Sequence, residues 1–516
     1  MLKVGQTAKT KKTTVKGTMK MFLNGLKKET NATTTQNGDK AYKSTLNHNL
    51  DVFAFSGGAH LDKRVMRKAK KAFIKALNED KELALRNLIN VRNFRDGGMG
   101  ERQLFRDMYI TMDEDTQIKM LPLVPEIGRW DDVVEIIKTT QYGRVKRTGY
   151  ALIQKQLNAD YVAMTKDEPI SLLVKWLPSD KGSKTTQENR KFIRELGFPY
   201  RRDYRKMLSA LRPKLKLVET ELSQKRYDID FNKVPSRAFN KYQNAFWRHL
   251  NDQMEAYIES VNKGEKKIKM AGVTPDEVVH HFMKQSMYAL QHDKNVAAVA
   301  EAQWKSLSDL SVKPENTLVM ADVSGSMWFK PLEVSIGLAI YFAEQMTGEF
   351  HNHFMTFSER PELIELSDNM SLEEKVTEVF DANWGMNTDL NKAFNLILST
   401  ACKNKVPQED MPKTLLIISD MQFDSSWGDK STFETAKREF EQMGYKLPNI
   451  VFWNVAGDTA PVTENEDNVG LLSGFTPTVM ETIMTMDLDK LTPINLMLTQ
   501  LNKDKYTDML KTVNLI

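Results

Sequence analysis

The sequence has 516 residues and a formal net charge of +5, and its length predicts two or three domains. It contains one cysteine, Cys402, which excludes an internal disulfide. Hydrophobic residues make up 41% of the chain and charged residues 27%, as is typical of a soluble globular protein. No apolar run approaches the ~20 residues of a membrane-spanning helix, and the basic N-terminus lacks the apolar stretch of a secretory signal, so we expect a cytoplasmic protein without membrane contact.

Residues 1–45 are expected to form a basic, flexible arm. They contain ten lysines but only two acidic residues, together with many Thr, Asn and Gly. Such a segment offers too little apolar surface to pack into a core, so it should stay mobile.

Residues 46–311 are predicted to form an all-helical domain. Apolar residues recur there at intervals of three or four, and short breaks separate the helices, as in stacks of antiparallel helix pairs. No strict sequence period is present, so HEAT-like repeats are only one arrangement that would fit.

Residues 1–310 carry a net charge of +20 and residues 311–516 a net charge of −15. The basic part favours a polyanion, most often nucleic acid, over electrostatic docking between the two parts.

The densest basic stretch, residues 181–216, interleaves Lys and Arg with Tyr and Phe. Lys and Arg neutralise phosphates, and an aromatic ring such as Tyr200 or Tyr204 could stack on a base. For any single residue, a solvated helix face with core aromatics is about as good an explanation. The residues expected to contact RNA are Arg201, Arg202, Tyr204, Arg205, Lys206, Lys214 and Lys216.

Residues 312–516 are predicted to form a doubly wound α/β domain. Buried strands such as NTLVMAD (316–322) and KTLLIISD (413–420) alternate with helices. This alternation predicts a parallel sheet that is covered on both faces. In such a sheet, ligands bind beyond the carboxyl ends of the strands.

Three separated stretches place oxygen ligands at that edge. Asp322, Ser324 and Ser326 form a D-x-S-x-S motif directly after one strand, Asp420 ends another strand, and Thr388 precedes a helix between them. Hydroxyls with few carboxylates suit Mg²⁺, which keeps several of its waters, so we expect Mg²⁺ or another divalent cation here. The same side chains could also cap the helices that follow, which is compatible with metal binding. A serine nucleophile is not indicated, because G-x-S-x-G is absent and no histidine stands in a triad-like context.

These five residues resemble the metal-ion-dependent adhesion site (MIDAS) of von Willebrand factor A domains, over roughly residues 314–480. The resemblance implies that the serines and the threonine bind the metal, that the aspartates hold it largely through water, and that a partner's carboxylate completes its shell.

The helical part resembles a second family through stretches such as RNFRDGGMGERQLFRDMY and PEIGRWDDVVEI. With the A-type domain behind them, they are similar to the Ro autoantigen (TROVE) group, in particular to a branch known as a domain of unknown function from plants, fungi and large phages. In the Ro group a ring of HEAT-like helical repeats is closed by a von Willebrand A domain. This resemblance implies binding of structured RNA or of single-stranded RNA ends.

We therefore expect a non-enzymatic RNA-binding protein, with a basic helical domain fused to a metal-binding A-type domain. The alternative is a protein–protein adaptor whose metal site captures an Asp or Glu of a partner. Magnesium-assisted phosphoryl chemistry ranks third, because neither a base nor a nucleophile stands out.

Overall fold

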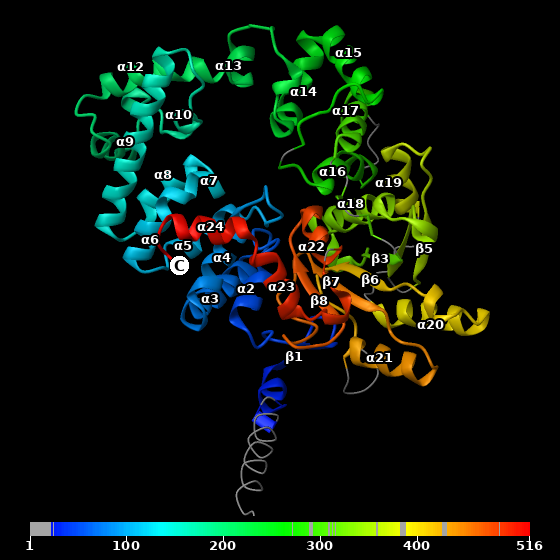
Figure 1. The fold of residues 1–516 in the computed structure, drawn as a ribbon. Helices are drawn as coiled ribbons and strands as arrows, with labels where there is room; N and C mark the ends of the chain where they lie inside the picture. Colours follow the sequence, from blue (N-terminus) through cyan, green and yellow to red (C-terminus); the bar gives the residue numbers. More distant parts are fainter. Residues whose placement is uncertain are drawn as a thin grey trace, which may run out of the picture.

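The computed structural model contains a mainly helical part followed by a domain built on one large sheet (Figure 1). The structure describes residues 22–23, 25–270, 272–287, 293–307, 310–311, 313–314, 316–357, 360–381, 389–425, 431–484 and 486–516. The order of the two parts agrees with the predicted combination of an all-helical and an α/β class.

Helices dominate the chain from residue 48 to residue 305, as predicted. Local signals explain where they form: α3 begins after Asp62, whose side chain accepts the N–H of Arg64, and it buries Val65, Ala69 and Phe73 on one face. A HEAT-like repeat arrangement stays a prediction. The helices of this part are α2 (His48–Phe55), α3 (Lys63–Glu79), α4 (Lys81–Arg92), α5 (Arg102–Tyr109), α6 (Glu114–Met120), α7 (Val124–Ile127), α8 (Trp130–Thr139), α9 (Gly143–Thr165), α10 (Leu173–Trp176), α11 (Gln187–Glu195), α12 (Arg201–Leu211), α13 (Val218–Ser223), α14 (Ser236–His249), α15 (Asn251–Asn262), α16 (Pro275–Met287) and α17 (Lys294–Lys305).

The second part is built on a six-stranded sheet with the order β5-β4-β3-β6-β7-β8. Neighbouring strands are parallel, except that the edge strand β5 runs antiparallel to β4. The strands are β3 (Thr317–Asp322), β4 (His353–Phe357), β5 (Glu362–Glu365), β6 (Thr414–Ser419), β7 (Asn449–Asn454) and β8 (Val469–Ser473). The helices of this part are α18 (Lys330–Gln345), α19 (Leu372–Asp381), α20 (Leu390–Asn404), α21 (Thr432–Gln442), α22 (Met480–Met484), α23 (Pro493–Leu501) and α24 (Asp504–Thr512).

The central strand β3 is buried on both faces because helices cover the sheet from both sides. Val319 and Ala321 belong to the core that includes α18, whereas Leu318 and Met320 belong to the core that includes α20 and α21. Successive side chains of a strand point to opposite faces, so a strand between two cores needs an uninterrupted apolar run. This explains why the sequence of β3 shows no polar alternation.

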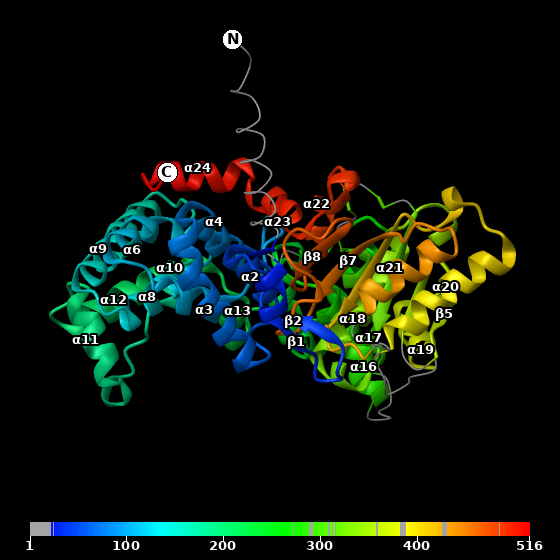
Figure 2. The same ribbon diagram turned by 90° about the horizontal axis from the view of Figure 1, so that it is seen from below.

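The helices of the first part follow a curved path that leaves the sheet domain and returns to it (Figures 1 and 2). At the beginning of the path, α2 packs against β8 and α23. At its end, α16 packs against α18 and α19. The sheet domain therefore joins the two ends of the helical part.

The N-terminal segment departs from the prediction of a flexible arm up to residue 45. Residues 32–42 form a small antiparallel hairpin of β1 (Ala32–Thr34) and β2 (Lys40–Tyr42). The hairpin lies on the sheet domain: the Thr35 hydroxyl donates to the carbonyl of Phe423 at 2.6 Å, and Tyr42 and Ala460 exchange two backbone hydrogen bonds. Buried Ala41 and Tyr42 explain why this stretch packs rather than staying mobile.

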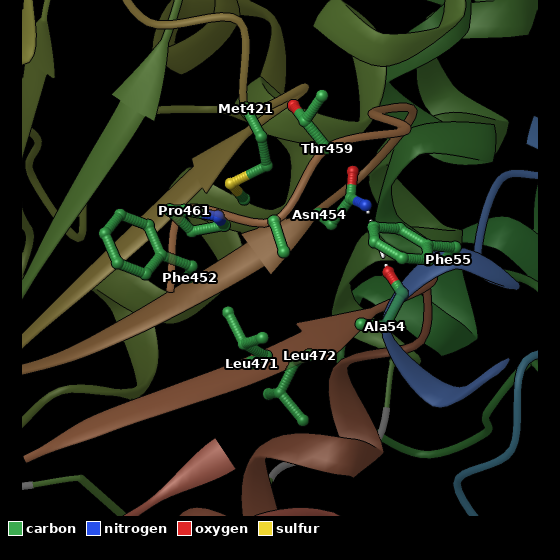
Figure 3. A pocket seen from close by; sticks show the side chains of 10 residues that line it. Ala54, Phe55, Met421, Phe452, Asn454, Thr459, Pro461, Leu471 and Leu472 are labelled. Carbon is green, nitrogen blue, oxygen red and sulfur yellow. Dashed lines mark hydrogen bonds between the residues drawn. The ribbon is translucent and has the colours of Figure 1, made fainter. Parts of the chain in front are cut away.

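Helix α2 also lies on the sheet domain, and a cavity of about 10 Å³ remains at this seam (Figure 3). Ala54 and Phe55 of α2 line it on one side, and Phe452 and Leu471 of the sheet line it on the other. A space of this size holds about one water, so the seam is closely packed and offers no ligand pocket.

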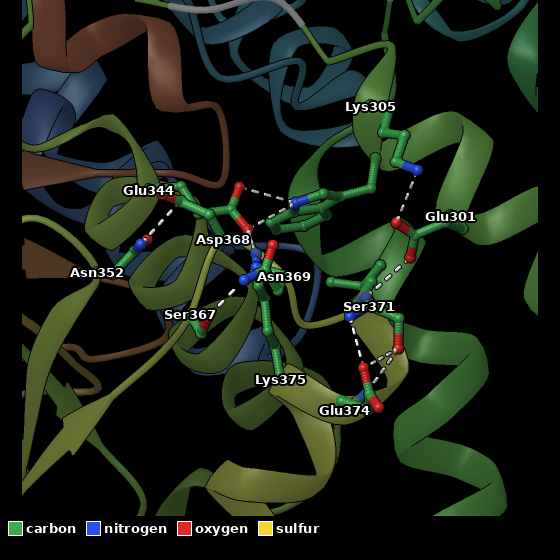
Figure 4. A network of polar contacts seen from close by, with 12 residues as sticks. Glu301, Lys305, Glu344, Asn352, Ser367, Asp368, Asn369, Ser371, Glu374 and Lys375 are labelled. Carbon is green, nitrogen blue, oxygen red and sulfur yellow. Dashed lines mark hydrogen bonds and ion pairs between the residues drawn. The ribbon is translucent and has the colours of Figure 1, made fainter. Parts of the chain in front are cut away.

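The other junction, between α17, α18 and α19, is polar (Figure 4). Glu344 of α18 accepts hydrogen bonds from the Nε1–H of Trp304 at 2.9 Å and from the Nζ of Lys375 at 2.6 Å. Nearby, Glu301 of α17 accepts the backbone N–H of Leu372 at the start of α19. These contacts fix the last helix of the first part to the sheet domain.

In the part of the chain that the structure describes, none of the helices is both long and apolar enough to cross a membrane.

Candidate metal centre

The predicted site lies where the direction of the sheet's winding reverses. The chain passes from the central strand β3 to β4 on one side and later crosses to β6 on the other. In doubly wound sheets, the carboxyl ends of the two strands at this switch point flank the ligand crevice. Asp322 ends β3, and Asp420 directly follows β6, so both carboxylates are located at this crevice.

Asp322 is fully buried and held by two hydrogen bonds. Its Oδ1 accepts the backbone N–H of Ser324 at 2.9 Å, and its Oδ2 accepts the hydroxyl of Ser419 at 2.6 Å. Burial and the negative charge of Asp420 raise the pKa of Asp322 to about 7. The two carboxylates are therefore close enough to repel each other in the absence of a counter-ion.

The two serines sit in the turn that leaves β3. Ser324 precedes a short 3₁₀ turn over Gly325–Met327, and its Oγ lies 3.2 Å from the Oγ of Ser326. Ser324 is buried, whereas Ser326 is exposed. The pair of hydroxyls thus extends from the buried carboxylates to the solvent, which gives the site an open side.

Asp420 completes the group of four. Its Oδ1 accepts the backbone N–H of Gln422 at 3.1 Å. Burial raises the pKa of Asp420, and a hydrogen bond from Ser326 opposes that rise. The structure therefore brings together Asp322, Ser324, Ser326 and Asp420, from two neighbouring strand ends.

The fifth predicted ligand, Thr388, lies outside the described residues. The next residue, Asp389, accepts the backbone N–H of Lys392 at 3.2 Å and caps α20. Helix capping was the alternative role considered for this stretch, and Asp389 performs it.

The donor set suits a hard divalent cation. Buried, mutually repelling carboxylates beside two hydroxyls form an oxygen-only environment that a positive ion would stabilise. In the described ranges, no three His, Cys, Asp or Glu side chains gather closely enough to hold a metal. Any cation at this edge would therefore depend on the serine hydroxyls, and Mg²⁺ would keep several waters.

Sequence reasoning missed Ser419, which fixes the orientation of the Asp322 carboxylate. Its position directly before Asp420 at a strand end was the available signal, because Ser419 and Asp322 lie at the ends of neighbouring parallel strands.

The sequence also gave no indication that the N-terminal hairpin supports the loop after Asp420. The side chain of Gln422 accepts the backbone N–H of Gln36 at 2.8 Å, and its carbonyl accepts the amide of Asn37 at 2.6 Å.

Two exposed aromatic residues directly follow the serine turn in the sequence. Trp328 and Phe329 follow the serine turn and are 43% and 68% exposed. Phe329 has a φ of 72°, a backbone conformation that aromatic residues rarely adopt and that costs free energy. Exposed apolar side chains thus occur within three residues of Ser326, at the start of α18.

The predicted RNA-binding stretch is only partly available for RNA. Tyr204 was expected as a possible stacking ring, and this interpretation is wrong: its ring is fully buried, and its hydroxyl donates to the carbonyl of Pro178 at 2.6 Å. Tyr204, Leu208 and Leu211 share the buried face of α12. Their i, i+4, i+7 spacing could have identified Tyr204 as a core residue.

Several of the predicted cations are neutralised within the chain. Arg201 and Arg205 lie 3.4 and 3.5 Å from the buried carboxylate of Asp180, and Lys214 pairs with Asp167. Arg202 lies 3.4 Å from the side chain of Asp203, its neighbour in sequence. Lys206 and Lys216 are exposed and have no carboxylate within ion-pair distance among the described residues.

Comparison with known proteins gives matches along most of the chain. Residues 183–313 match the family model Domain of unknown function (DUF2828), and residues 316–511 match Domain of unknown function (DUF7788). The chain is 31% identical to Uncharacterized protein L728 of Acanthamoeba polyphaga mimivirus over 515 positions, which cover 91% of this chain and 87% of that protein. The matches agree with the expected similarity to a domain of unknown function.

Proposed function

Since the chain belongs to the family of mimivirus protein L728, we propose that this family consists of metal-dependent binding proteins whose sheet domain is of the von Willebrand A type. In this proposal a divalent cation is held by Asp322, Ser324, Ser326, Thr388 and Asp420 and takes an oxygen atom of the binding partner. The observation that carries the proposal is the convergence of four of these side chains at the switch point of the sheet.

Each described residue has a defined task in this proposal. The serine hydroxyls would bind the cation, and the buried carboxylates of Asp322 and Asp420 would balance its charge, largely through water. Ser419 keeps the Asp322 carboxylate oriented towards the serine turn. A bound cation would supply the Lewis acidity that attracts a negatively charged oxygen.

The surroundings favour a carboxylate of a protein partner as that oxygen. The C-terminal part carries a net charge of −15, so a polyanion would be repelled by most of this domain. One carboxylate avoids this repulsion because the cation neutralises it. The exposed rings of Trp328 and Phe329 add apolar contact area of the kind that anchors protein interfaces.

Metal binding can be tested with Mn²⁺, whose unpaired electrons report binding directly in an equilibrium titration. The unmodified full-length chain should bind one Mn²⁺, and Ser324→Ala should weaken binding about tenfold or more. Ser399→Ala, which removes an exposed hydroxyl on α20, should leave binding unchanged. Equal affinities of the unmodified chain and Ser324→Ala would refute the site.

Partner capture needs a second experiment. Proteins crosslinked to the unmodified chain in cells should include a partner that is lost both in the presence of EDTA and in the Asp322→Ala variant. If the crosslinked partners are the same with EDTA and with the Asp322→Ala variant as without them, capture through the metal is contradicted.

RNA binding by the helical part is a second candidate function. It is favoured by the net charge of +20 over residues 1–310, by Tyr200, which is 68% exposed and precedes α12, and by the exposed side chains of Lys206 and Lys216. The burial of Tyr204 and the pairing of Arg201, Arg205 and Lys214 leave a smaller surface than the sequence indicated.

The RNA candidate predicts a salt-dependent affinity for a single-stranded RNA of about 20 nucleotides. The double variant Lys206→Gln/Lys216→Gln should lower the slope of log affinity against log salt by roughly 1.4, or about 0.7 for each lost phosphate contact. The matched control Lys155→Gln/Lys166→Gln removes two exposed charges of α9 and its C-cap, and it should keep the slope. No measurable RNA binding at about 50 mM salt would exclude this function.

A further inference from the structure

A basic hollow lies between α3, the start of α2 and the segment after β2, far along the chain from both sites considered so far. Its volume is about 540 Å³, within the range of small-molecule pockets. Its charged lining residues include Lys43, His48, Arg67, Lys71 and Lys75.

One face of α3 supplies most of this charge. Arg64, Arg67, Lys68, Lys71 and Lys75 follow one another at intervals of one, three or four residues, and all of them line the hollow. The opposite face of α3 is apolar and buried. Residues 67 to 75 span about 12 Å along the helix axis, so these cations are concentrated over a short distance.

Two other elements add cations to the lining. Lys43 follows β2, and His48 begins α2. A hydrogen bond with Asp51 raises the pKa of His48, which increases its positively charged fraction near neutral pH. Positive charges from several elements thus line one concavity, which suits a compact anion. An extended polymer would instead need a row of basic side chains that continues beyond the hollow.

Some of the cations and the one lining carboxylate are already engaged. Arg64 pairs with Asp62 at 2.9 Å, and the ammonium of Lys68 lies 4.0 Å from the centre of the Phe55 ring. Asp51 accepts hydrogen bonds from the hydroxyl of Ser44 and from the N–H and hydroxyl of Thr45.

Four cations are left without an acidic partner. Lys43, Arg67, Lys71 and Lys75 are exposed and have no carboxylate within ion-pair distance in the described ranges. Like charges held around one concavity repel each other, and this repulsion costs free energy that a bound polyanion would remove.

We propose that this hollow binds a compact polyphosphate, a small molecule with several closely spaced phosphate groups, through Lys43, Arg67, Lys71 and Lys75. Neighbouring phosphates carry more negative charge per unit of volume than carboxylates, and Lys and Arg form charge-assisted hydrogen bonds with them. The proposal does not depend on the cation at the sheet edge, because no residue is shared between the two sites.

The test is a calorimetric titration of the full-length chain with tripolyphosphate and, separately, with inositol hexakisphosphate. Lys71→Gln/Lys75→Gln keeps the helix propensity of α3 while it removes two charges, and it should weaken binding at least about tenfold. Lys43→Gln, which removes the lining cation after β2, should also weaken binding, as convergence from several elements requires. The control Lys155→Gln/Lys166→Gln removes the same number of charges and should keep the affinity within about twofold.

Other results would overturn the proposal. No heat of binding from either polyphosphate, or equal weakening in the control, would reduce the hollow to a solvated basic surface. Binding of a single-stranded RNA that Lys71→Gln/Lys75→Gln weakens but that tripolyphosphate does not displace would show that the occupant is RNA instead. Because Ser324→Ala leaves these cations intact, it should bind polyphosphate normally even if the metal site fails its own test.

Discussion

The polar cluster where α17 meets α18 and α19 can be tested by removing the charge of Lys375, which lies on α19 and pairs with the same Glu344 that binds Trp304 of α17. This side chain is 9% exposed and forms an ion pair of 2.6 Å with Glu344, whose side chain is 20% exposed. Lys375→Met keeps most of the side-chain volume but leaves the Glu344 carboxylate with the Nε1–H of Trp304 as its remaining donor among the described residues. We expect this variant to be less stable than the unmodified chain.

The size of the loss follows from the burial of the pair. Removing one partner of a buried ion pair costs about 3–5 kcal/mol. Glu344 is partly exposed and keeps one hydrogen bond, so we expect a loss of about 2–3 kcal/mol. Adding Glu344→Gln removes the stranded charge and retains an acceptor for the indole, and the double variant should recover most of this loss.

The assay is urea unfolding followed by circular dichroism for the unmodified chain, both single variants and the double variant. The four free energies form a double-mutant cycle that isolates the interaction. Lys263→Met, which breaks a fully exposed ion pair with Glu259, serves as the control and should leave the transition unchanged. A Lys375→Met variant as stable as the unmodified chain, or a double variant whose loss equals the sum of the single losses, would refute the reasoning.

Further predictions concern the two sites and one seam. Without divalent cations, the stability of the folded chain should fall as pH rises from about 4 through 7, because the raised pKa of Asp322 favours its protonated form in the folded state. The Asp322→Asn variant should flatten this pH dependence, which thermal unfolding in EDTA at pH 5 and pH 8 would measure. Tyr204→Phe should cost about 1 kcal/mol in urea unfolding without changing RNA affinity, whereas Tyr200→Ala should weaken RNA binding in an anisotropy titration without changing stability. Gly57→Ala should destabilise the folded chain by more than about 2 kcal/mol, because a Cβ at residue 57 would lie 1.9 Å from the backbone nitrogen of Gly474. An unchanged melting temperature in thermal unfolding would contradict the close packing between the end of α2 and the sheet domain.

The class of the fold was predictable where burial leaves a local pattern. β3 and β6 lie between two cores, so they appear in the sequence as continuous apolar runs. Asp322 and Asp420 were predictable for a related reason, because a polar residue that ends such a run lies at the carboxyl edge of the sheet. Two neighbouring parallel strands then bring these ends together without further information.

Long-range contacts leave no such pattern. Thr35 and Phe423 are 388 positions apart and join through a hydroxyl and a backbone carbonyl, so neither residue type indicates the other. The same holds for Arg201 and Arg205, whose shared carboxylate, Asp180, lies in a loop about 20 residues earlier. Lys and Arg content therefore overestimates the free charge of a surface, because tertiary pairing decides how much of it a ligand meets.

The position of α18 connects the candidate metal centre to the helical part. The helix begins four residues after Ser326, and its first residue, Lys330, forms an ion pair with the buried carboxylate of Asp276 on α16. Gly337, in the middle of α18, leaves room for the backbone of α16, and Glu344 near the end is held by α17 and α19. The helix that follows the serine turn is thus fixed along its whole length by the returning end of the helical part. Because the turn has to meet this fixed helix, the helical part constrains where the serine hydroxyls lie, which gives a physical reason for the two parts to occur in one chain.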